Sequence, residues 1–489
     1  MKINANIPAF ITNKQLLRIE GNMATSMERL SSGLKLNHAK DNPAGMAISN
    51  KMRAQIAGLD RASNNASDAI AAIRIADGAL NETSSIMQRM RELAVQAAND
   101  TNSLEDRQAI QQEIEALKEE VNRISRDTEY NEMPILDGTL SARVYADHVD
   151  RISTTDAVKA GMYQVEVTKA ATQAQVTSGT TDLDPNDSTT KIGEAGTVDI
   201  NGSKVEITAE DTYAQVYEKL RNAAEVGGAT LEVANNKMTV TSEKYGKKGV
   251  VAMSFTDANL AAKLGFDATA APLNPDTELY EVAPAIGTEP EIKLERNTGD
   301  SAFTDTATIA TEGNRVTITD NGDFRMSFLL DAGFDAAHDP DIAVGGDGAG
   351  LVELEVTDIG TMTVHIGANE NQNMVISVPE ISSDSLYIDD IDVTKIGGAG
   401  EAITRMDEAI KAVSSARSKL GAYENRLDYS VTSLDAFEEN MTEAQSRLAD
   451  TDMAQEMTTY TQQNVLNQAA ISVLTQANDM PQQVLQLLQ

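Results

Sequence analysis

An unbroken heptad repeat near the C-terminus constrains the fold of this 489-residue chain more than any other feature. One apolar residue recurs at every seventh position: Met406, Val413, Leu420, Leu427, Leu434, Met441 and Leu448. A second set, offset by three residues, is apolar at all positions but one: Ala409, Ala416, Tyr423, Ser430, Phe437 and Ala444. Alternating spacings of three and four residues place both sets on one helix face, which is typical of a coiled-coil seam. The pattern predicts a helix about 60 Å long that needs partner helices.

Two segments of the N-terminal region can supply these partners. The first has an apolar face at the same spacing and should end at the turn-forming residues 99–102. A second helix is expected from Ser103, with Asp106 placed as its capping-box acid. The apolar face of the first is Ile73, Ala76, Leu80, Thr83, Met87, Met90, Ala94 and Ala97; that of the second is Ile110, Ile114, Leu117, Val121 and Ile124. Because each helix must bury its face, we expect both chain ends to pack into one bundle.

The two terminal segments are amphipathic as well, but they carry few strong apolar anchors. Their stripes are Leu16, Met23, Met27, Leu30 and Leu34 near the N-terminus, and Leu466, Ala470, Val473, Ala477, Met480, Val484 and Leu487 near the C-terminus. Two interpretations are open. Either the terminal helices become ordered only when neighbouring chains cover these faces, or they are ordinary surface helices docked on the same bundle.

The middle of the chain differs in composition from both ends. Residues 135–400 hold 7 of the 11 prolines and 25 of the 31 glycines, and their net charge is −26 out of −35 for the whole chain. Alternating patterns around Asn201-Gly202, Asn235-Asn236 and Asn321-Gly322 predict hairpins, and a helix is expected over 213–224. We therefore predict an α+β fold: a long antiparallel coiled-coil bundle formed by both chain ends, with an inserted β-rich outer region of one or two α+β modules.

Composition and motifs argue against most kinds of chemistry. The chain has no Cys, its four histidines are scattered, and HExxH, GxxxxGK[ST] and GxSxG are absent. A net charge of −35 argues against binding to nucleic acid or to an anionic membrane. The first residues lack the apolar core of a cleaved signal peptide, so we expect none. We expect no enzyme, cofactor or metal site; an enzyme carried in the acidic insert is the alternative.

Several segments resemble the terminal regions of bacterial flagellins. They are residues 1–7, 28–37, 41–48, 88–99 and 136–138 near the N-terminus, and residues 421–427 and 484–488 near the C-terminus. The resemblance covers about residues 1–140 and 400–489, and its motifs occur in the family's order. Residues 366–369 are similar to the family's return from the variable region into the helical core. One departure is the final Gln489, where many relatives end in a basic residue.

The resemblance implies a structural subunit that is exported unfolded, secreted and polymerised into the extracellular filament of the bacterial flagellum for motility. It also implies three parts: terminal helices from 1–42 plus 453–489, a helical rod from 43–176 plus 362–452, and an acidic outer region, 177–361. The implied partners are further copies of the chain, an export chaperone and the filament cap. A hook–filament junction protein of the same superfamily is the alternative. The C-terminal polymerisation helix would present Leu466, Val473, Val484 and Leu487.

The resemblance further implies recognition by the innate receptor TLR5 of a host. The family's contact motif corresponds here to Arg89, Leu93 and Gln96 on the first long helix and to Glu113 on the second. Arg89 and Glu113 can make charge-assisted contacts with a partner, while Leu93 fills an apolar spot between them. In the alternative interpretation, Leu93 is a partly buried helix residue, and Arg89 and Glu113 form an ion pair within the chain.

Overall fold

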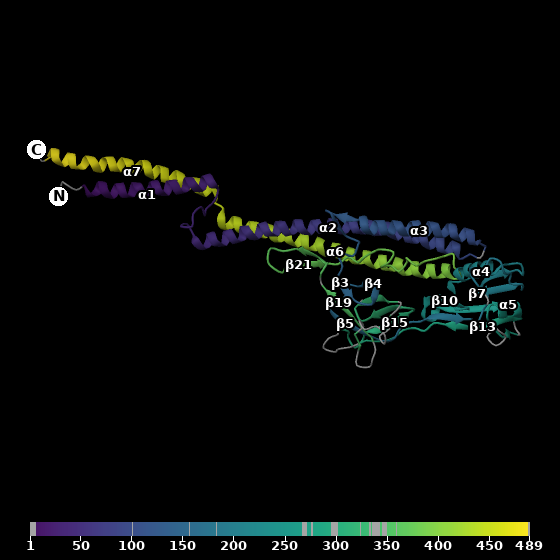
Figure 1. Ribbon diagram of the computed structural model, residues 1–489. Helices are drawn as coiled ribbons and strands as arrows, with labels where there is room; N and C mark the ends of the chain where they lie inside the picture. The colour runs from purple at the N-terminus through teal and green to yellow at the C-terminus, as the bar shows by residue number, and fades with distance from the viewer. Residues whose placement is uncertain are drawn as a thin grey trace. The chain divides into compact units, whose positions relative to one another are not determined.

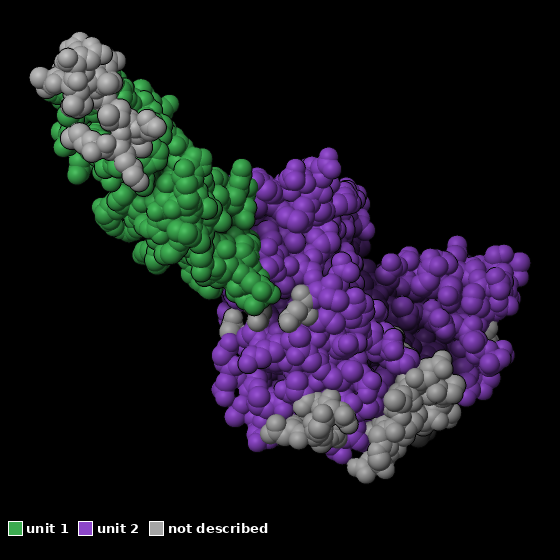
Figure 2. Space-filling model, turned by 90° about the vertical axis from the view of Figure 1, so that its left-hand side faces the viewer, with its two compact units in different colours: residues 1–70, 364–374, 425–489 green, residues 71–363, 375–424 purple. Residues whose placement is uncertain are grey.

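The computed structural model describes residues 6–99, 101–155, 157–181, 183–266, 271–274, 277–294, 302–322, 324–331, 334, 343–344, 350–357 and 359–487. The chain forms two compact units (Figure 2). Unit 1 contains residues 1–70, 364–374 and 425–489, and unit 2 contains residues 71–363 and 375–424. Two long helices, α2 (Pro43–Ala97) and α6 (Gly398–Ala449), contribute to both units.

In unit 1 the two terminal helices, α1 (Ile7–Ser32) and α7 (Met453–Leu487), lie side by side (Figure 1). Asn6 caps the start of α1, and its Nδ2 also donates to the carbonyl oxygen of Ala477 at 2.9 Å. At its other end α1 stops at Gly33, whose φ of 72° is a left-handed conformation that glycine adopts without strain. The N-terminal and C-terminal segments are therefore in contact near one end of this helix pair.

The opposite end of the helix pair is closed by a short β-bridge. Leu34 and Asp450 form this antiparallel bridge, next to the points where α1 ends and α7 begins. The N–H of Lys35 donates to the carbonyl oxygen of Ala449 at 2.7 Å, and the N–H of Thr451 donates to that of Gly33 at 2.9 Å. These backbone hydrogen bonds join the two chain segments that connect the terminal helices to α2 and α6.

The helical part of unit 2 contains the C-terminal part of α2, helix α3 (Leu104–Asp127) and the start of α6. The eight residues of the predicted apolar face between 73 and 97 are all buried, as are Ile110, Ile114 and Val121 of α3. The capping box at Ser103 and Asp106 is formed, which confirms the predicted start of α3.

Charged pairs align α2 with α6 in unit 2. Arg91 Nε donates to Asp407 Oδ1 at 2.5 Å, and Arg74 Nε donates to Glu424 Oε1 at 2.7 Å. The two arginines are separated along α2 by as many residues as their partners are along α6, but in the opposite direction. The helices therefore run antiparallel, as the predicted fold requires.

The acidic middle of the chain forms two hydrophobic cores. Around the first, which we call the sandwich module, two sheets have the strand orders β14-β5-β19-β18, with β3 also paired to β19, and β15-β16-β17-β4. Its strands are β3 (Arg143–Ala146), β4 (Val149–Thr154), β5 (Gly161–Lys169), β14 (Glu291–Leu294), β15 (Thr308–Glu312), β16 (Arg315–Thr319), β17 (Arg325–Leu330), β18 (Ala343–Val344) and β19 (Gly350–Thr357). Val165, Val316, Phe328 and Val352 meet in its core.

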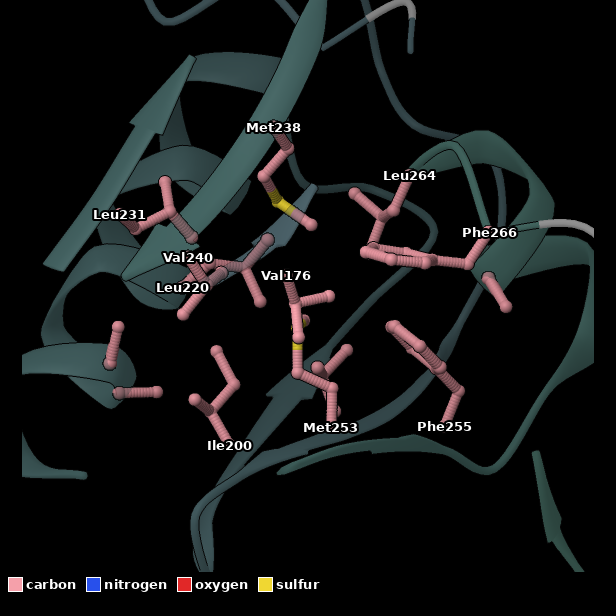
Figure 3. Packing of buried hydrophobic residues seen from close by; sticks show 14 of the residues in the cluster. Val176, Ile200, Leu220, Leu231, Met238, Val240, Met253, Phe255, Leu264 and Phe266 are labelled. Carbon is pink, nitrogen blue, oxygen red and sulfur yellow. The ribbon is translucent and has the colours of Figure 1, made fainter. Parts of the chain in front are cut away.

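The second core belongs to a module of sheets and helices, which we call the mixed module (Figure 3). Its sheets have the orders β6-β10-β9 and β12-β13-β11-β7-β8. Its elements are β6 (Gln173–Thr177), β7 (Gly196–Ile200), β8 (Ser203–Ile207), α4 (Tyr213–Val226), β9 (Ala229–Ala234), β10 (Lys237–Tyr245), η1 (Gly246–Lys248), β11 (Val250–Phe255), α5 (Ala258–Lys263), β12 (Leu273–Asn274) and β13 (Leu279–Ile286). Leu220, Met253 and Phe255 pack in its centre (Figure 3).

The mixed module is inserted into the sandwich module between β5 and β14. The two segments that connect the modules meet at Thr172 and Thr288. The N–H of Thr172 donates to the carbonyl oxygen of Thr288 at 3.0 Å. The threonine hydroxyl groups are 2.8 Å apart. Two short hairpins complete the described strands: β1 (Glu129–Tyr130) with β2 (Met133–Pro134), and β20 (Met362–His365) with β21 (Asn373–Ile376).

The α+β fold with helical ends and a β-rich middle is thus confirmed, and so are the three hairpins and the helix near 213–224. The β-rich region begins earlier than the expected boundary at 177. Strands β3 and β5 pair with β19, and β4 pairs with β17, so strands from before residue 177 belong to the sandwich module. The predicted boundary separated these strands from the rest of the sandwich module, because strands that pair with partners nearly 200 residues away leave no local pattern in the sequence.

Leu427 and Tyr429 of α6 provide a test of the seam. The Leu427 side chain is fully buried, whereas Tyr429 is 78% exposed. We expect Leu427→Ala to lower the free energy of unfolding of the helical region by about 2–5 kcal/mol, because it leaves a cavity in the seam. Tyr429→Ala should change it by less than about 0.5 kcal/mol. Denaturant titrations followed by helical circular dichroism measure both values, and equal effects would contradict the predicted register.

Candidate functional site

The residues of the expected receptor motif lie on α2 and α3. Arg89 Nη2 donates to Glu113 Oε1 at 2.8 Å, and Arg89 Nη1 is 3.3 Å from Glu92 Oε2. All three charged side chains are largely exposed. The hydrogen bond to Glu113, together with its charge, raises the pKa of the Arg89 guanidinium above its ordinary value. The pair therefore joins two neighbouring helices by an exposed ion pair.

Leu93 and Gln96 have different exposures. Gln96 is exposed on α2, whereas Leu93 is buried with 2% of its surface accessible. A partner binding here would contact Arg89, Gln96 and Glu113 and would not reach the Leu93 side chain without a rearrangement. In the single chain Arg89 and Glu113 pair with each other, as in the alternative interpretation, and Leu93 is buried more fully than the partly buried residue of that interpretation.

The heptad residues of α6 become less buried toward the C-terminal end of the helix. Met406, Val413, Leu420 and Leu427 are at most 1% exposed, and Leu434 is 8% exposed. Met441 and Leu448 are only half-buried, and Phe437 of the second heptad set is 60% exposed. The seam is thus fully covered in unit 2 and less completely covered in unit 1.

An open groove accompanies this loss of burial in unit 1. It has a volume of about 540 Å³ and is lined by α2, α6 and the loop between β20 and β21. Its lining residues carry no charge, and they include Leu59, Ile366, Tyr429, Phe437 and Met441. Tyr429 lies outside both heptad sets, so the heptad repeat does not predict its place in the groove. The only local indication of such a place is an aromatic residue among mostly polar neighbours.

The terminal helices carry more exposed large apolar side chains than the other described helices. The predicted polymerisation residues Leu466 and Val473 are exposed, while the side chains of Val484 and Leu487 lie outside the described residues. Large apolar side chains are also exposed at Ile7, Phe10, Ile11, Leu17 and Met27 of α1 and at Met453, Met457, Val465, Ile471 and Met480 of α7. In the described part of this pair, the buried apolar side chains are Ile19 and Ala477.

Polar side chains of α3 have a structural role that the sequence did not indicate. Lys118 is buried, and its Nζ donates to the carbonyl oxygen of Asp389 at 2.6 Å. Gln111 bonds the backbone at Ile391 and Val393, at 2.9 Å each. These contacts hold the segment before α6 along α3, and in the sequence such residues look like an ordinary solvated face.

Among the described residues, no group of three or more His, Asp or Glu side chains is placed to hold a metal ion. Among the helices described, none combines the length and hydropathy that crossing a membrane requires.

Both helical ends of the chain match models of known protein families. Residues 3–141 match the family model of the bacterial flagellin N-terminal helical region, and residues 403–488 match that of the C-terminal helical region. Polar flagellin B/D of Vibrio parahaemolyticus is 30% identical over 488 residues, which is 100% of this chain and 99% of that protein. A flagellin of Clostridium tyrobutyricum is 32% identical over 486 residues, which is 99% of this chain and 100% of that protein.

Among solved structures, hook associated protein-3 of Legionella pneumophila aligns with 82% of this chain and 98% of its own. The TM-score is 0.29 and the identity 14%, a likeness too low to carry an argument. The relatives named flagellin match over nearly the whole of both chains. The chain therefore belongs to the bacterial flagellin family, and it is a structural protein of the extracellular flagellum and not an enzyme.

Proposed function

We propose that this flagellin polymerises by burying the exposed apolar faces of α1 and α7 against neighbouring copies of itself. The observation that carries the proposal is the exposure of apolar residues on this helix pair. Ten or more large apolar side chains are exposed, whereas Ile19 and Ala477 are buried. Contiguous apolar surface of this extent is rare on a protein that stays monomeric. Leu466 and Val473 lie on the exposed side and are therefore available to a neighbour.

The form of the contact follows from the asymmetry of the surfaces. An apolar helix face on one copy and a different surface on the next make a head-to-tail contact, which repeats without closing and produces a helical filament. The uncharged groove at Tyr429 and Phe437 is further surface that a neighbouring copy can cover. In this proposal residues 1–42 and 453–489 form the inner part, the helical rod surrounds it, and the β-rich region faces outward.

Export in an unfolded state is the second part of the proposal. The chain has no Cys, so it can form no disulfide that would hinder passage through a narrow channel. The same exposed face of α7 would need protection before export, and we propose that an export chaperone binds it. The filament cap would then fold and place the arriving subunit.

Recognition by TLR5 is the third part of the proposal. It is supported by the exposed Arg89, Gln96 and Glu113 on adjacent helices, since hot spots in interfaces are often built around arginine. Leu93 is buried on the same helix as Arg89 and Gln96. A junction protein of the same superfamily is the second candidate for the chain's role. It would join filament and hook without polymerising indefinitely, so the length of the polymers separates the two roles.

Leu466→Asp tests assembly through α7. The exposed position should tolerate the charge in the monomer, so the melting temperature should stay the same, whereas polymerisation should fail because a carboxylate would be buried at the contact. Leu273→Asp is the matched control, since Leu273 is also exposed but lies in the mixed module. Seeded polymerisation followed by electron microscopy gives the result. Normal filaments from Leu466→Asp would refute this contact.

Excision of the mixed module tests its outward position. Joining Thr172 to Thr288 through a short Gly-Ser linker removes residues 173–287. The linker stands where the two segments that lead into and out of the module already touch. The module also contacts the rest of unit 2 through ion pairs, such as Lys244 with Glu401 and Lys248 with Glu312. We expect the shortened chain to form filaments of normal length and smaller diameter in electron micrographs. A folded shortened chain that stays monomeric would count against an outward-facing module.

Arg89→Ala tests receptor recognition. We expect binding of the monomer to the TLR5 ectodomain to weaken by tenfold or more, as for the loss of about 1.4 kcal/mol or more at an interface hot spot. Arg123→Ala is the control, because Arg123 is an equally exposed arginine of α3 that pairs with Glu120 on its own helix. Surface plasmon resonance compares the two. Equal affinities of Arg89→Ala and the unchanged protein would remove Arg89 from the site.

A further inference from the structure

The chain contains two Asn-Gly dipeptides, Asn201-Gly202 and Asn321-Gly322, and both lie in hairpin turns. In such a dipeptide the backbone nitrogen of glycine can attack Cγ of the asparagine, because glycine has no Cβ to obstruct the approach. The glycine nitrogen loses its proton and bonds to Cγ, the Cγ–Nδ2 bond breaks, and ammonia leaves. Water then opens the cyclic imide at either carbonyl and yields aspartate or isoaspartate. The reaction needs no enzyme, but both groups must be free to move.

At Asn201 both reacting groups are held in place. Its side-chain amide makes three hydrogen bonds to the backbone: Nδ2 donates to the carbonyl oxygens of Gly227 at 2.9 Å and Val250 at 3.0 Å, and Oδ1 accepts from the N–H of Ala252 at 2.8 Å. The N–H of Gly202 donates to Asp199 Oδ1 at 2.7 Å. Attack on Cγ would therefore have to break four hydrogen bonds, each of which contributes to the barrier.

At Asn321 the same groups are largely free. Both Asn321 and Gly322 are exposed at the tip of the hairpin between β16 and β17. Among the described residues, the amide makes one hydrogen bond, from Nδ2 to Thr306 Oγ1 at 3.1 Å. In the part of the chain that the structure describes, the N–H of Gly322 has no acceptor, and a Cβ built on Gly322 would meet no atom within 4 Å.

We propose that Asn321 is a site of spontaneous deamidation in the folded protein, whereas Asn201 is protected from the same reaction. The inference rests on these hydrogen bonds and not on the proposed function. The new carboxylate would stand beside Asp320, which already accepts from Thr306 Oγ1 at 2.5 Å. Isoaspartate would also lengthen the backbone of the turn by one carbon. The modification therefore adds negative charge to the exposed tip of this hairpin, in an already acidic region.

Mass spectrometry of the folded and the denatured chain tests the proposal. Trypsin releases the two sites in separate peptides, residues 192–204 and 316–325, so each site can be followed in the same sample. The full chain is incubated at one pH and temperature, with and without denaturant, and the rates in denaturant give the reactivity of each dipeptide without structure. Folding should slow Asn201 by more than about a hundredfold and Asn321 by less than about tenfold. Equal protection of both sites would overturn the proposal.

A variant tests whether hydrogen bonds cause the difference. Asp199→Ala removes the acceptor of the Gly202 N–H, so the native deamidation rate at Asn201 should rise by about fivefold, while the rate at Asn321 stays the same. Thr306→Val removes the one hydrogen bond of the Asn321 amide and should raise the rate only at Asn321. If neither variant changes the rate at its own site, hydrogen bonding does not control the reaction and the proposal fails.

Discussion

The antiparallel seam between α2 and α6 is the interaction on which the rest of the structure depends. Met406, Val413 and Leu420 bury their side chains completely in it, and Arg91 with Asp407 and Arg74 with Glu424 set its alignment. Through this seam the two distant ends of a 489-residue chain come together. Everything between them can then be an insertion, because the sandwich module and the mixed module leave and return without interrupting the helices.

The single chain leaves part of this seam uncovered. It is fully covered in unit 2, but in unit 1 Met441 and Leu448 are half-buried and Phe437 is exposed. The terminal helices bury even less. Their described contacts include the hydrogen bond from Asn6 to Ala477 and the ion pair of Arg29 with Glu456, and the bridge at Leu34 lies next to them. A protein that must polymerise gains from this arrangement, since the free energy of burying these faces becomes available only in the assembly.

Local patterns predicted the elements better than their partners. The heptads predicted the long helix, and the dipeptides Asn201-Gly202 and Asn321-Gly322 predicted their hairpins. Both kinds of prediction succeeded because helix faces and tight turns depend on residues that are close in the sequence. The pairing of β3 and β5 with β19 was not predictable in this way, and neither was the start of the sandwich module. No local pattern distinguished Lys118, which is buried, and Leu93, which the resemblance implied as a contact residue, is buried as well. Those outcomes depend on what the rest of the chain brings to each helix.

Hydrogen–deuterium exchange of monomer and filament measures most directly whether the terminal helices are completed by neighbouring copies. The account predicts that backbone amides of α1 and α7 exchange quickly in the monomer, where few apolar side chains cover them, and become strongly protected in the filament. Amides of β11, in the core of the mixed module, should exchange at the same rate in both states. Terminal helices that exchange equally in monomer and filament would contradict the claim that assembly buries them.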